Sequence, residues 1–265
     1  MKQLRILFKF YINASIHVAL AVLALVGVTV LQFGLEVRAF FWLFLFCGTI
    51  TGYNFVKYAK IAGLHHRSLT NSLRSIQVFS LFNFAGLLAS SFFLSPQTLL
   101  LMAFLGLLTF FYAVPFLRKK NLRTFSGVKI FVVALVWSGI TVFGPMAEVG
   151  MVWTIDCWIA FFQRFLLVFV WTLPFEIRDL RYDVKKLKTI PQLLGVSATK
   201  GIGIVVLVGV ILLDGLTQGL LFSTHYALVF VAVVSGFALV LSQKKQSQYF
   251  ASFWVEGIPI IWFVS

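Results

Sequence analysis

The sequence is poor in acidic residues. Its 265 residues hold only 8 aspartates and glutamates against 22 lysines and arginines, and charged residues make up 11% of the chain. Soluble domains carry about 25% charged residues, whereas 60% of this chain is hydrophobic and its mean hydropathy is +0.98. This composition excludes a soluble globular protein and indicates an integral membrane protein.

Cysteine is also scarce. Cys47 and Cys157 are the only two; they match no metal or redox motif, and we interpret both as packing residues. The apolar runs lack the two-residue alternation of a membrane barrel, so the backbone polar groups have to be satisfied within helices. Because no polar stretch is long enough for a soluble domain, the sequence predicts one polytopic all-α membrane domain over residues 1–265.

Long apolar runs, in contrast, are abundant. A membrane-spanning helix needs about 20 mainly apolar residues, and nine runs approach this length, the last being shorter and containing Glu256 and Pro259. Segment 2–27 could pass for a signal peptide, but it has no clear cleavage site and more spans follow, so we interpret its apolar part as the first span. The sequence therefore predicts a bundle of nine transmembrane helices. The expected spans are residues 14–33, 39–55, 75–94, 97–117, 127–147, 152–174, 200–221, 225–242 and 248–265.

The net charge of +14 is distributed in a pattern typical of membrane topology. If the N-terminus is cytoplasmic and the spans alternate, 20 of the 22 lysines and arginines fall in cytoplasmic segments. This distribution argues against a nucleic-acid partner and predicts that most cations set the topology and contact membrane lipid. We expect the inner (plasma) membrane of a bacterium, with a cytoplasmic N-terminus.

Three carboxylates lie within eight residues at the end of the sixth expected span. Glu176, Asp179 and Asp183 are spaced so that a continuing helix would place all three on one side. Carboxylates beside a membrane are costly, and a one-sided group of them suits a hard divalent cation and a phosphorylated substrate. The alternative is a solvated turn in which these acids pair with the neighbouring arginines and lysines.

The residues that follow carry a family resemblance. Asp179-x3-Asp183 is trailed by Thr189-Ile190-Pro191-x2-Leu194-Gly195, which resembles the second aspartate motif of the UbiA-type intramembrane prenyltransferases. The resemblance implies that Asp179 and Asp183 bind Mg²⁺ against the diphosphate of an isoprenyl donor, with Glu176 in support. It departs from the usual pattern at Leu187, where a glycine is common.

A second match lies at the end of the fourth expected span. Tyr112-x2-Pro115-x3-Lys119 resembles the loop that borders the active site in this family. The resemblance implies that Tyr112 borders an allylic cation and that Lys119 contacts the diphosphate, with Tyr112 and Asp183 as the catalytic residues. The alternative is a proline that ends a helix, followed by basic membrane anchors.

The first aspartate motif of the family is degenerate in this chain. Asn54 matches its asparagine, but Phe55, Tyr58 and Ala62 stand where aspartates are expected. Lys57 and Lys60 lie on the same helical face as Asn54, and ammonium groups can neutralise diphosphate oxygens directly. Our hypothesis is that Asn54, Lys57 and Lys60 bind the diphosphate and that the lysines replace part of the missing metal's role. The alternative is that both lysines only set the topology.

The resemblance implies transfer of an isoprenyl group from a polyprenyl diphosphate to an acceptor, as in quinone or lipid biosynthesis. Loss of the first aspartates leaves a second interpretation open, a non-catalytic relative that binds an isoprenoid or a partner enzyme. A small transporter fits the hydropathy but lacks a pair of broken helices.

Arg164 and Glu256 are ionisable residues inside expected spans, where a charge needs a partner or an aqueous cavity. They are possible partners of each other. Alternatively, the long side chain of Arg164 reaches the outer surface.

Overall fold

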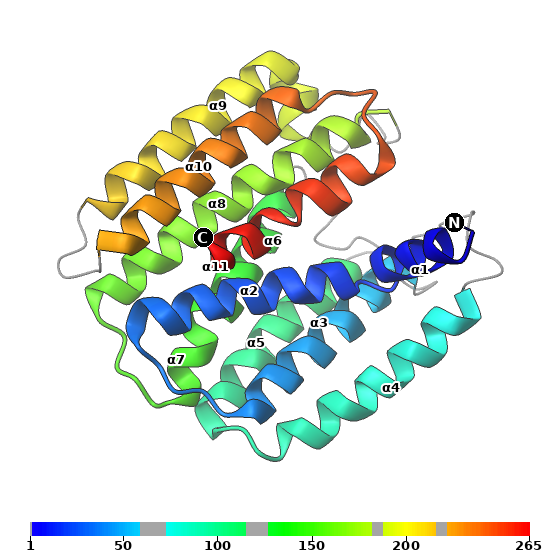
Figure 1. The fold of residues 1–265 in the computed structure, drawn as a ribbon, viewed down its shortest axis with the longest axis vertical. Coiled ribbons are helices and arrows are strands. Elements are labelled where there is room, and N and C mark those ends of the chain that lie inside the picture. Colours follow the sequence, from blue (N-terminus) through cyan, green and yellow to red (C-terminus); the bar gives the residue numbers. More distant parts are fainter. Residues whose placement is uncertain (1, 59–72, 115–126, 182–187, 216–221) are drawn as a thin grey trace.

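The computed structural model describes residues 2–58, 73–114, 127–181, 188–215 and 222–265, and these form helices without any strand. Figure 1 shows a bundle in which α8, α9 and α10 run side by side and α2 crosses the middle of the view. The helices, including two π-helical segments η3 and η5, are α1 (Lys2–Asn13), α2 (Ile16–Phe33), α3 (Ala39–Tyr58), α4 (Leu73–Ser91), α5 (Pro96–Ala113), α6 (Val128–Ser138), η3 (Gly139–Phe143), α7 (Gly144–Glu148), α8 (Ile155–Asp179), α9 (Ile190–Asp214), α10 (Phe222–Leu241), η5 (Phe250–Val255) and α11 (Ile258–Val264).

Seven helical stretches are long and apolar enough to cross a membrane: α2, α3, α4, α5, α8, α9 and the continuous run from α6 to α7. Two further apolar helices, within α10 and over Phe250–Val264, are shorter. The described part of the chain is therefore all-helical as expected, but it does not confirm the count of nine spans. The last expected span is interrupted near Gly257, where η5 ends and α11 begins.

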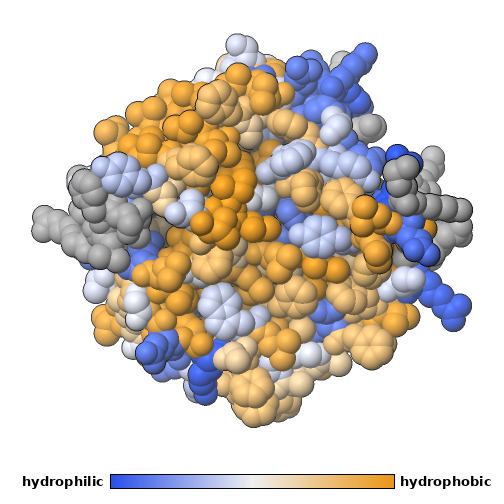
Figure 2. Space-filling model, viewed as in Figure 1, coloured by the Kyte–Doolittle hydropathy of each residue, from blue (hydrophilic) through white to orange (hydrophobic). Residues whose placement is uncertain are grey.

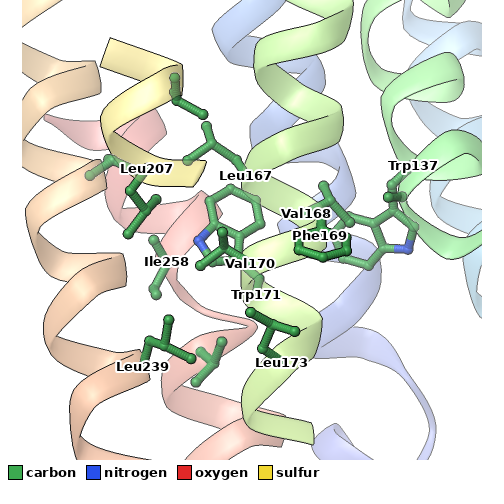
Figure 3. Close-up of a cluster of buried hydrophobic side chains, with 14 of the residues drawn as sticks. Trp137, Leu167, Val168, Phe169, Val170, Trp171, Leu173, Leu207, Leu239 and Ile258 are labelled. Carbon is green, nitrogen blue, oxygen red and sulfur yellow. The ribbon is translucent and has the colours of Figure 1, made fainter. Parts of the chain in front are cut away.

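The core surrounds α8, which is buried along most of its length. Leu167, Trp171 and Leu173 of α8 pack against α9, α10 and α11 (Figure 3). The indole of Trp171 donates a 2.8 Å hydrogen bond to Ser235 Oγ on α10. Helices in a bilayer associate through close packing and such hydrogen bonds because lipid is as apolar as their own side chains.

Close approach of two helices depends on Gly203 of α9. A Cβ at this position would lie 2.3 Å from Leu239 Cδ2 of α10 and 3.0 Å from Leu173 Cδ1 of α8. A side chain at this position would force the ends of the Leu239 and Leu173 side chains to move, and glycine avoids this. The outer helices α4, α5 and α9 expose much of their apolar surface, and the face in Figure 2 is largely hydrophobic, as expected for contact with lipid.

The amphipathic helix α1 lies across one end of the bundle, beside the ends of α3 and α4 (Figure 1). Phe10 of α1 contacts Phe79 of α4, and Phe8 contacts Tyr249 and Phe253 near η5. We call this end the basic end of the bundle; it carries Lys57 and Arg178 together with the acids Glu176 and Asp179. Helix α1 thus connects elements that lie far apart in the sequence at this end.

Candidate functional site

Asn54 of α3 is buried at the basic end and its side-chain amide is fully engaged. Its nitrogen donates to Ser80 Oγ at 2.8 Å and to the Ala14 carbonyl at 3.2 Å, and its oxygen accepts from Ser15 Oγ at 2.8 Å. The amide thereby ties α3 to α4 and to the turn between α1 and α2. The structure places Asn54 as a link between helices, one turn before Lys57.

Lys57 points inward from the next turn of α3. Its ammonium donates to Ser15 Oγ at 2.9 Å and lies 5.9 Å from the centre of the Tyr53 ring. Ser15 is fully buried and has a φ of 62°, a left-handed conformation that is uncommon for a residue other than glycine. The Ser15 hydroxyl therefore accepts a hydrogen bond from Lys57 and donates one to Asn54. It positions both side chains.

The turn at Ser15 is held from the other side by Tyr11 and His17. Tyr11 hydroxyl and His17 Nδ1 are 2.7 Å apart, and His17 Nε2 donates to the Phe253 carbonyl at 2.9 Å. Burial raises the pKa of the Tyr11 phenol, which keeps it protonated and able to donate to His17. The start of α2 consequently joins Lys57 on α3 to the π-helical segment η5.

Aromatic residues line the same interior region. Trp137 Nε1 of α6 donates to Tyr53 hydroxyl at 2.6 Å. Tyr112, near the end of α5, is buried, and its phenol is close enough to Tyr53 for an electrostatic interaction. The predicted site residue Tyr112 thus lies near Tyr53 and Trp137, which sequence reasoning did not identify because neither belongs to a recognisable motif.

The acidic residues at the end of α8 are separately partnered. Glu176 is 3% exposed and its Oε1 lies 3.7 Å from Lys129 Nζ of α6. Asp179 accepts a 2.8 Å hydrogen bond from Arg178 Nε, and the Arg178 guanidinium also lies 5.2 Å from the Phe175 ring centre. Glu176 and Asp179 lie in the last turn of α8, but the helix ends at Asp179. The continuing helix that would have placed Asp183 on the same side is therefore not what the structure shows, because residues 180 and 181 already form a turn.

Glu256 contributes a carboxylate from the junction between η5 and α11. It lies near enough to Lys57 and Arg178 to interact with them electrostatically. Among the described residues, however, it forms no direct ion pair with either. Glu256, Lys57 and Tyr53 all keep partial solvent exposure within the interior of the bundle. The basic end therefore brings groups from α3, α6, α8 and the η5–α11 junction around one polar interior region.

Arg164 in the middle of α8 is 1% exposed and belongs to a different cluster. It donates to the Leu25 carbonyl at 2.7 Å and to Thr141 Oγ1 at 3.4 Å, and it lies over the Trp262 ring at 4.7 Å. No carboxylate in the described ranges pairs with it. The suggested pairing of Arg164 with Glu256 is therefore not what the structure shows, because the Arg164 guanidinium donates to Leu25 and Thr141. Arg164 does not extend to a surface either.

The predicted site residues Lys60, Lys119 and Asp183 lie outside the described residues, as does Ala62 of the degenerate motif. Two of the three positions where the motif expects an aspartate, Phe55 and Tyr58, are described. Phe55 stacks with Phe110 of α5, and Tyr58 hydroxyl donates to the Asn13 carbonyl at 2.8 Å. Both side chains take part in packing between helices where the family resemblance expects carboxylates.

A divalent metal needs several oxygen ligands that converge. Within the part of the chain that the structure describes, no three histidine, cysteine, aspartate or glutamate residues are grouped so as to hold a metal ion. Asp179 offers a carboxylate, but one of its oxygens is bound to Arg178. The described residues thus do not fit a complete Mg²⁺ site, and what they do assemble is a cluster of cations, hydroxyls and aromatic rings.

An all-helical bundle with a lipid-exposed apolar surface and a polar interior at one end defines an integral membrane protein with a candidate binding site. The UbiA prenyltransferase family model matches residues 68–256, and the chain belongs to that family. No match was found among curated protein sequences.

Solved structures share the fold at low sequence identity. A UbiA homolog from Archaeoglobus fulgidus bound to GPP and Mg²⁺ is 14% identical with a TM-score of 0.65, covering 97% of both chains. The apo UbiA homolog from Aeropyrum pernix K1 is 16% identical with a TM-score of 0.62, covering 93% of this chain and 96% of the other. A structure described as concerning digeranylgeranylglyceryl phosphate synthase in membranes is 15% identical with a TM-score of 0.58, covering 100% of this chain and 98% of the other.

Proposed function

We propose that this protein is a membrane prenyltransferase, which transfers an isoprenyl group from a polyprenyl diphosphate to an acceptor. The observation that carries the proposal is the inward-pointing Lys57 beside the Tyr53 ring, whose hydroxyl accepts from Trp137, in the interior of a UbiA-family fold. A homolog of the same fold binds GPP and Mg²⁺, which supports a prenyl diphosphate as the substrate class here.

In such a reaction the bond between C1 of the isoprenyl group and the diphosphate oxygen breaks, and the diphosphate leaves with the electron pair. The acceptor then forms a bond to C1 and loses a proton. The protein has to neutralise the leaving diphosphate and protect the allylic cation from water. Lys57 and Arg178 supply positive charge for the first task, and the faces of Tyr53 and Tyr112 suit the second because aromatic rings attract cations.

The remaining predicted residues take supporting places in this proposal. Asn54 acts through Ser15, since its amide is already occupied and Ser15 in turn binds Lys57. Lys60 and Lys119 add positive charge near the diphosphate. Mg²⁺ binding by Asp179 and Asp183, supported by Glu176, remains a prediction from the family motif, and we assign it no step because the described donors do not make a metal site.

The positive-inside distribution supports a basic end that faces the cytoplasm. We therefore place the N-terminus and the site on the cytoplasmic side of a bacterial plasma membrane. Protease or cysteine-labelling access to residues of α1 in sealed vesicles tests this orientation.

A second candidate function is a non-catalytic relative that binds an isoprenoid or a partner protein. It is favoured by Phe55 and Tyr58, which make packing contacts at positions where metal-binding aspartates are expected. The two functions differ in turnover, because a non-catalytic relative would bind a prenyl diphosphate without breaking its C–O bond.

The deciding experiment incubates purified protein with farnesyl or geranylgeranyl diphosphate, Mg²⁺ and a panel of quinone and lipid acceptors, and measures diphosphate release. Release that is lost in Asp183→Ala supports the enzyme. Saturable binding without release supports the non-catalytic relative. If the protein neither binds nor cleaves a prenyl diphosphate, both functions are wrong.

A further inference from the structure

Glu256 is the one charged residue of the apolar segment Phe250–Val264. Its backbone nitrogen donates to the Ala251 carbonyl at 3.1 Å, and its neighbours Val255 and Ile258 are 1% exposed within the central core. A carboxylate in such a segment is costly to bury and normally has a functional or charge-balancing reason. The backbone of Glu256 is thus fixed by packed residues on both sides.

Two cations from different helices lie near this carboxylate. Lys57 comes from α3 and Arg178 from the end of α8, and both interact electrostatically with Glu256. The packing independently brings these elements together. Ser15 accepts a hydrogen bond from Lys57. Two residues later, His17 donates to the Phe253 carbonyl of η5. On the other side, Ile177, adjacent to Arg178, packs in the same core cluster as Val255.

Neither cation is neutralised by Glu256 in a direct ion pair. Lys57 donates to a neutral hydroxyl, and Arg178 donates to Asp179. A carboxylate placed at longer range lowers the electrostatic cost of holding two interior cations without blocking them. An incoming anion of higher charge attracts both cations more strongly, Lys57 directly and Arg178 in competition with Asp179.

We propose that Glu256 is a resident counter-ion, which balances Lys57 and Arg178 before substrate binds and gives way to the diphosphate as their partner. This inference rests on the proposed function and adds a role in product release. Since the carboxylate competes with diphosphate for the same two cations, it keeps the binding of released diphosphate weak. Glu256 is a positioning residue because it acts through Lys57 and Arg178 without touching the reacting atoms.

The test measures binding of inorganic pyrophosphate to the detergent-purified full chain, by calorimetry, for wild type, Glu256→Gln and Glu256→Asp. The isosteric Glu256→Gln change removes the competing charge, so pyrophosphate affinity is expected to rise by about tenfold. Glu256→Asp keeps the charge and should bind as the wild type does. Glu36→Gln, an exposed acid on the loop between α2 and α3, is the matched control and should leave the affinity unchanged.

A gain in affinity for Glu256→Gln that disappears when Lys57→Met is added supports the counter-ion role, since the effect then acts through Lys57. A lower KM together with a lower kcat in Glu256→Gln supports it further, because diphosphate leaves more slowly. Unchanged or weaker pyrophosphate binding in a folded Glu256→Gln variant overturns the counter-ion while leaving the proposed function intact. Failure of every variant and of the wild type to bind pyrophosphate overturns both.

Discussion

Arg164 donates a 2.7 Å hydrogen bond to the carbonyl oxygen of Leu25, a residue 139 positions earlier in the chain. The same guanidinium reaches Thr141 in the π-helical segment η3 and stacks over Trp262 of α11. One side chain therefore connects α2, η3, α8 and α11 in the middle of the bundle. Its charge is dispersed over a planar group, which tolerates an apolar interior better than an ammonium does.

This arrangement predicts that Arg164→Lys destabilises the protein more than Arg164→Met. Lysine retains a strongly hydrated charge and loses the planar set of donors, whereas methionine removes the charge and its cost of burial. We expect Arg164→Lys to lower the free energy of unfolding by about 2 kcal/mol, measured by thermal or denaturant unfolding in detergent. The exposed Arg74→Lys change is the control and should have no effect. Equal stability of Arg164→Lys and wild type would contradict the role of the planar donors.

Glu148 is expected to stabilise the end of the bundle opposite Lys57. Its carboxylate accepts from Arg38 at 2.5 Å and 3.1 Å, from the Ser95 backbone nitrogen at 3.0 Å and from Thr98 Oγ1 at 2.9 Å. Glu148→Gln keeps the shape but removes the charge that strengthens these hydrogen bonds, so a loss of about 1–3 kcal/mol in unfolding free energy is expected. Diphosphate binding should not change, because the site lies at the other end. A stability like that of Glu36→Gln would contradict this prediction.

Lys57 is expected to carry a measurable share of diphosphate affinity. Lys57→Met removes an inward-pointing cation, and pyrophosphate binding should weaken about tenfold, which corresponds to about 1.4 kcal/mol. Lys9→Met removes an equivalent charge from the exposed face of α1 and is the matched control. If both variants lose the same affinity, general surface charge is responsible and Lys57 has no specific role.

Ser15 is expected to act on the site through its hydroxyl and on stability through its backbone. Ser15→Ala removes the contacts to Lys57 and Asn54 and retains a side chain at a φ of 62°. Ser15→Gly removes the same contacts but relieves the left-handed strain, so its free energy of unfolding should exceed that of Ser15→Ala by about 1 kcal/mol. Both should weaken pyrophosphate binding equally. The prediction is wrong if the two variants bind pyrophosphate with different affinities and have the same free energy of unfolding.

The metal prediction is tested by metal dependence. If Asp179 and Asp183 bind Mg²⁺, then Asp183→Asn should raise the Mg²⁺ concentration needed for half-maximal diphosphate release by at least about tenfold, since a carboxylate ligand is replaced by a neutral amide. The measurement is a Mg²⁺ titration of wild type, Asp179→Asn and Asp183→Asn. Diphosphate release that persists in excess chelator would show that the cations suffice without the metal.

Hydropathy predicted most helices because burial in lipid depends on composition over about 20 residues. The expected span 39–55 corresponds to Ala39–Tyr58, and 152–174 corresponds to Ile155–Asp179. The π-helical segment Gly139–Phe143 lies inside the expected span 127–147 and was not predictable, because it leaves the apolar run unbroken. The expected spans 225–242 and 248–265 correspond to the shorter apolar helices His225–Leu241 and Phe250–Val264, and for this reason the count of nine is not confirmed.

The candidate site was predictable only where a motif or a costly charge marked it. The spacing of Glu176, Asp179 and Asp183 predicted three carboxylates on one side of a continuing helix, whereas α8 ends at Asp179. Glu256 was recognised as an ionisable residue in an apolar segment. Its partners could not be inferred, because contacts between residues some 200 positions apart depend on how the helices pack. Ser15 and Trp137 carry no local signal at all, since a serine or a tryptophan in an apolar run is ordinary.

The contacts of α1 have a practical consequence for handling the protein. Phe8 and Phe10 fasten this helix to η5 and α4, and Tyr11 supports the turn from which Ser15 holds Lys57. A bulky fusion partner joined to the amino end, or removal of the first dozen residues, would loosen that turn from a distance and imitate an inactivating mutation. Affinity tags for purification and assay therefore belong at the carboxyl end.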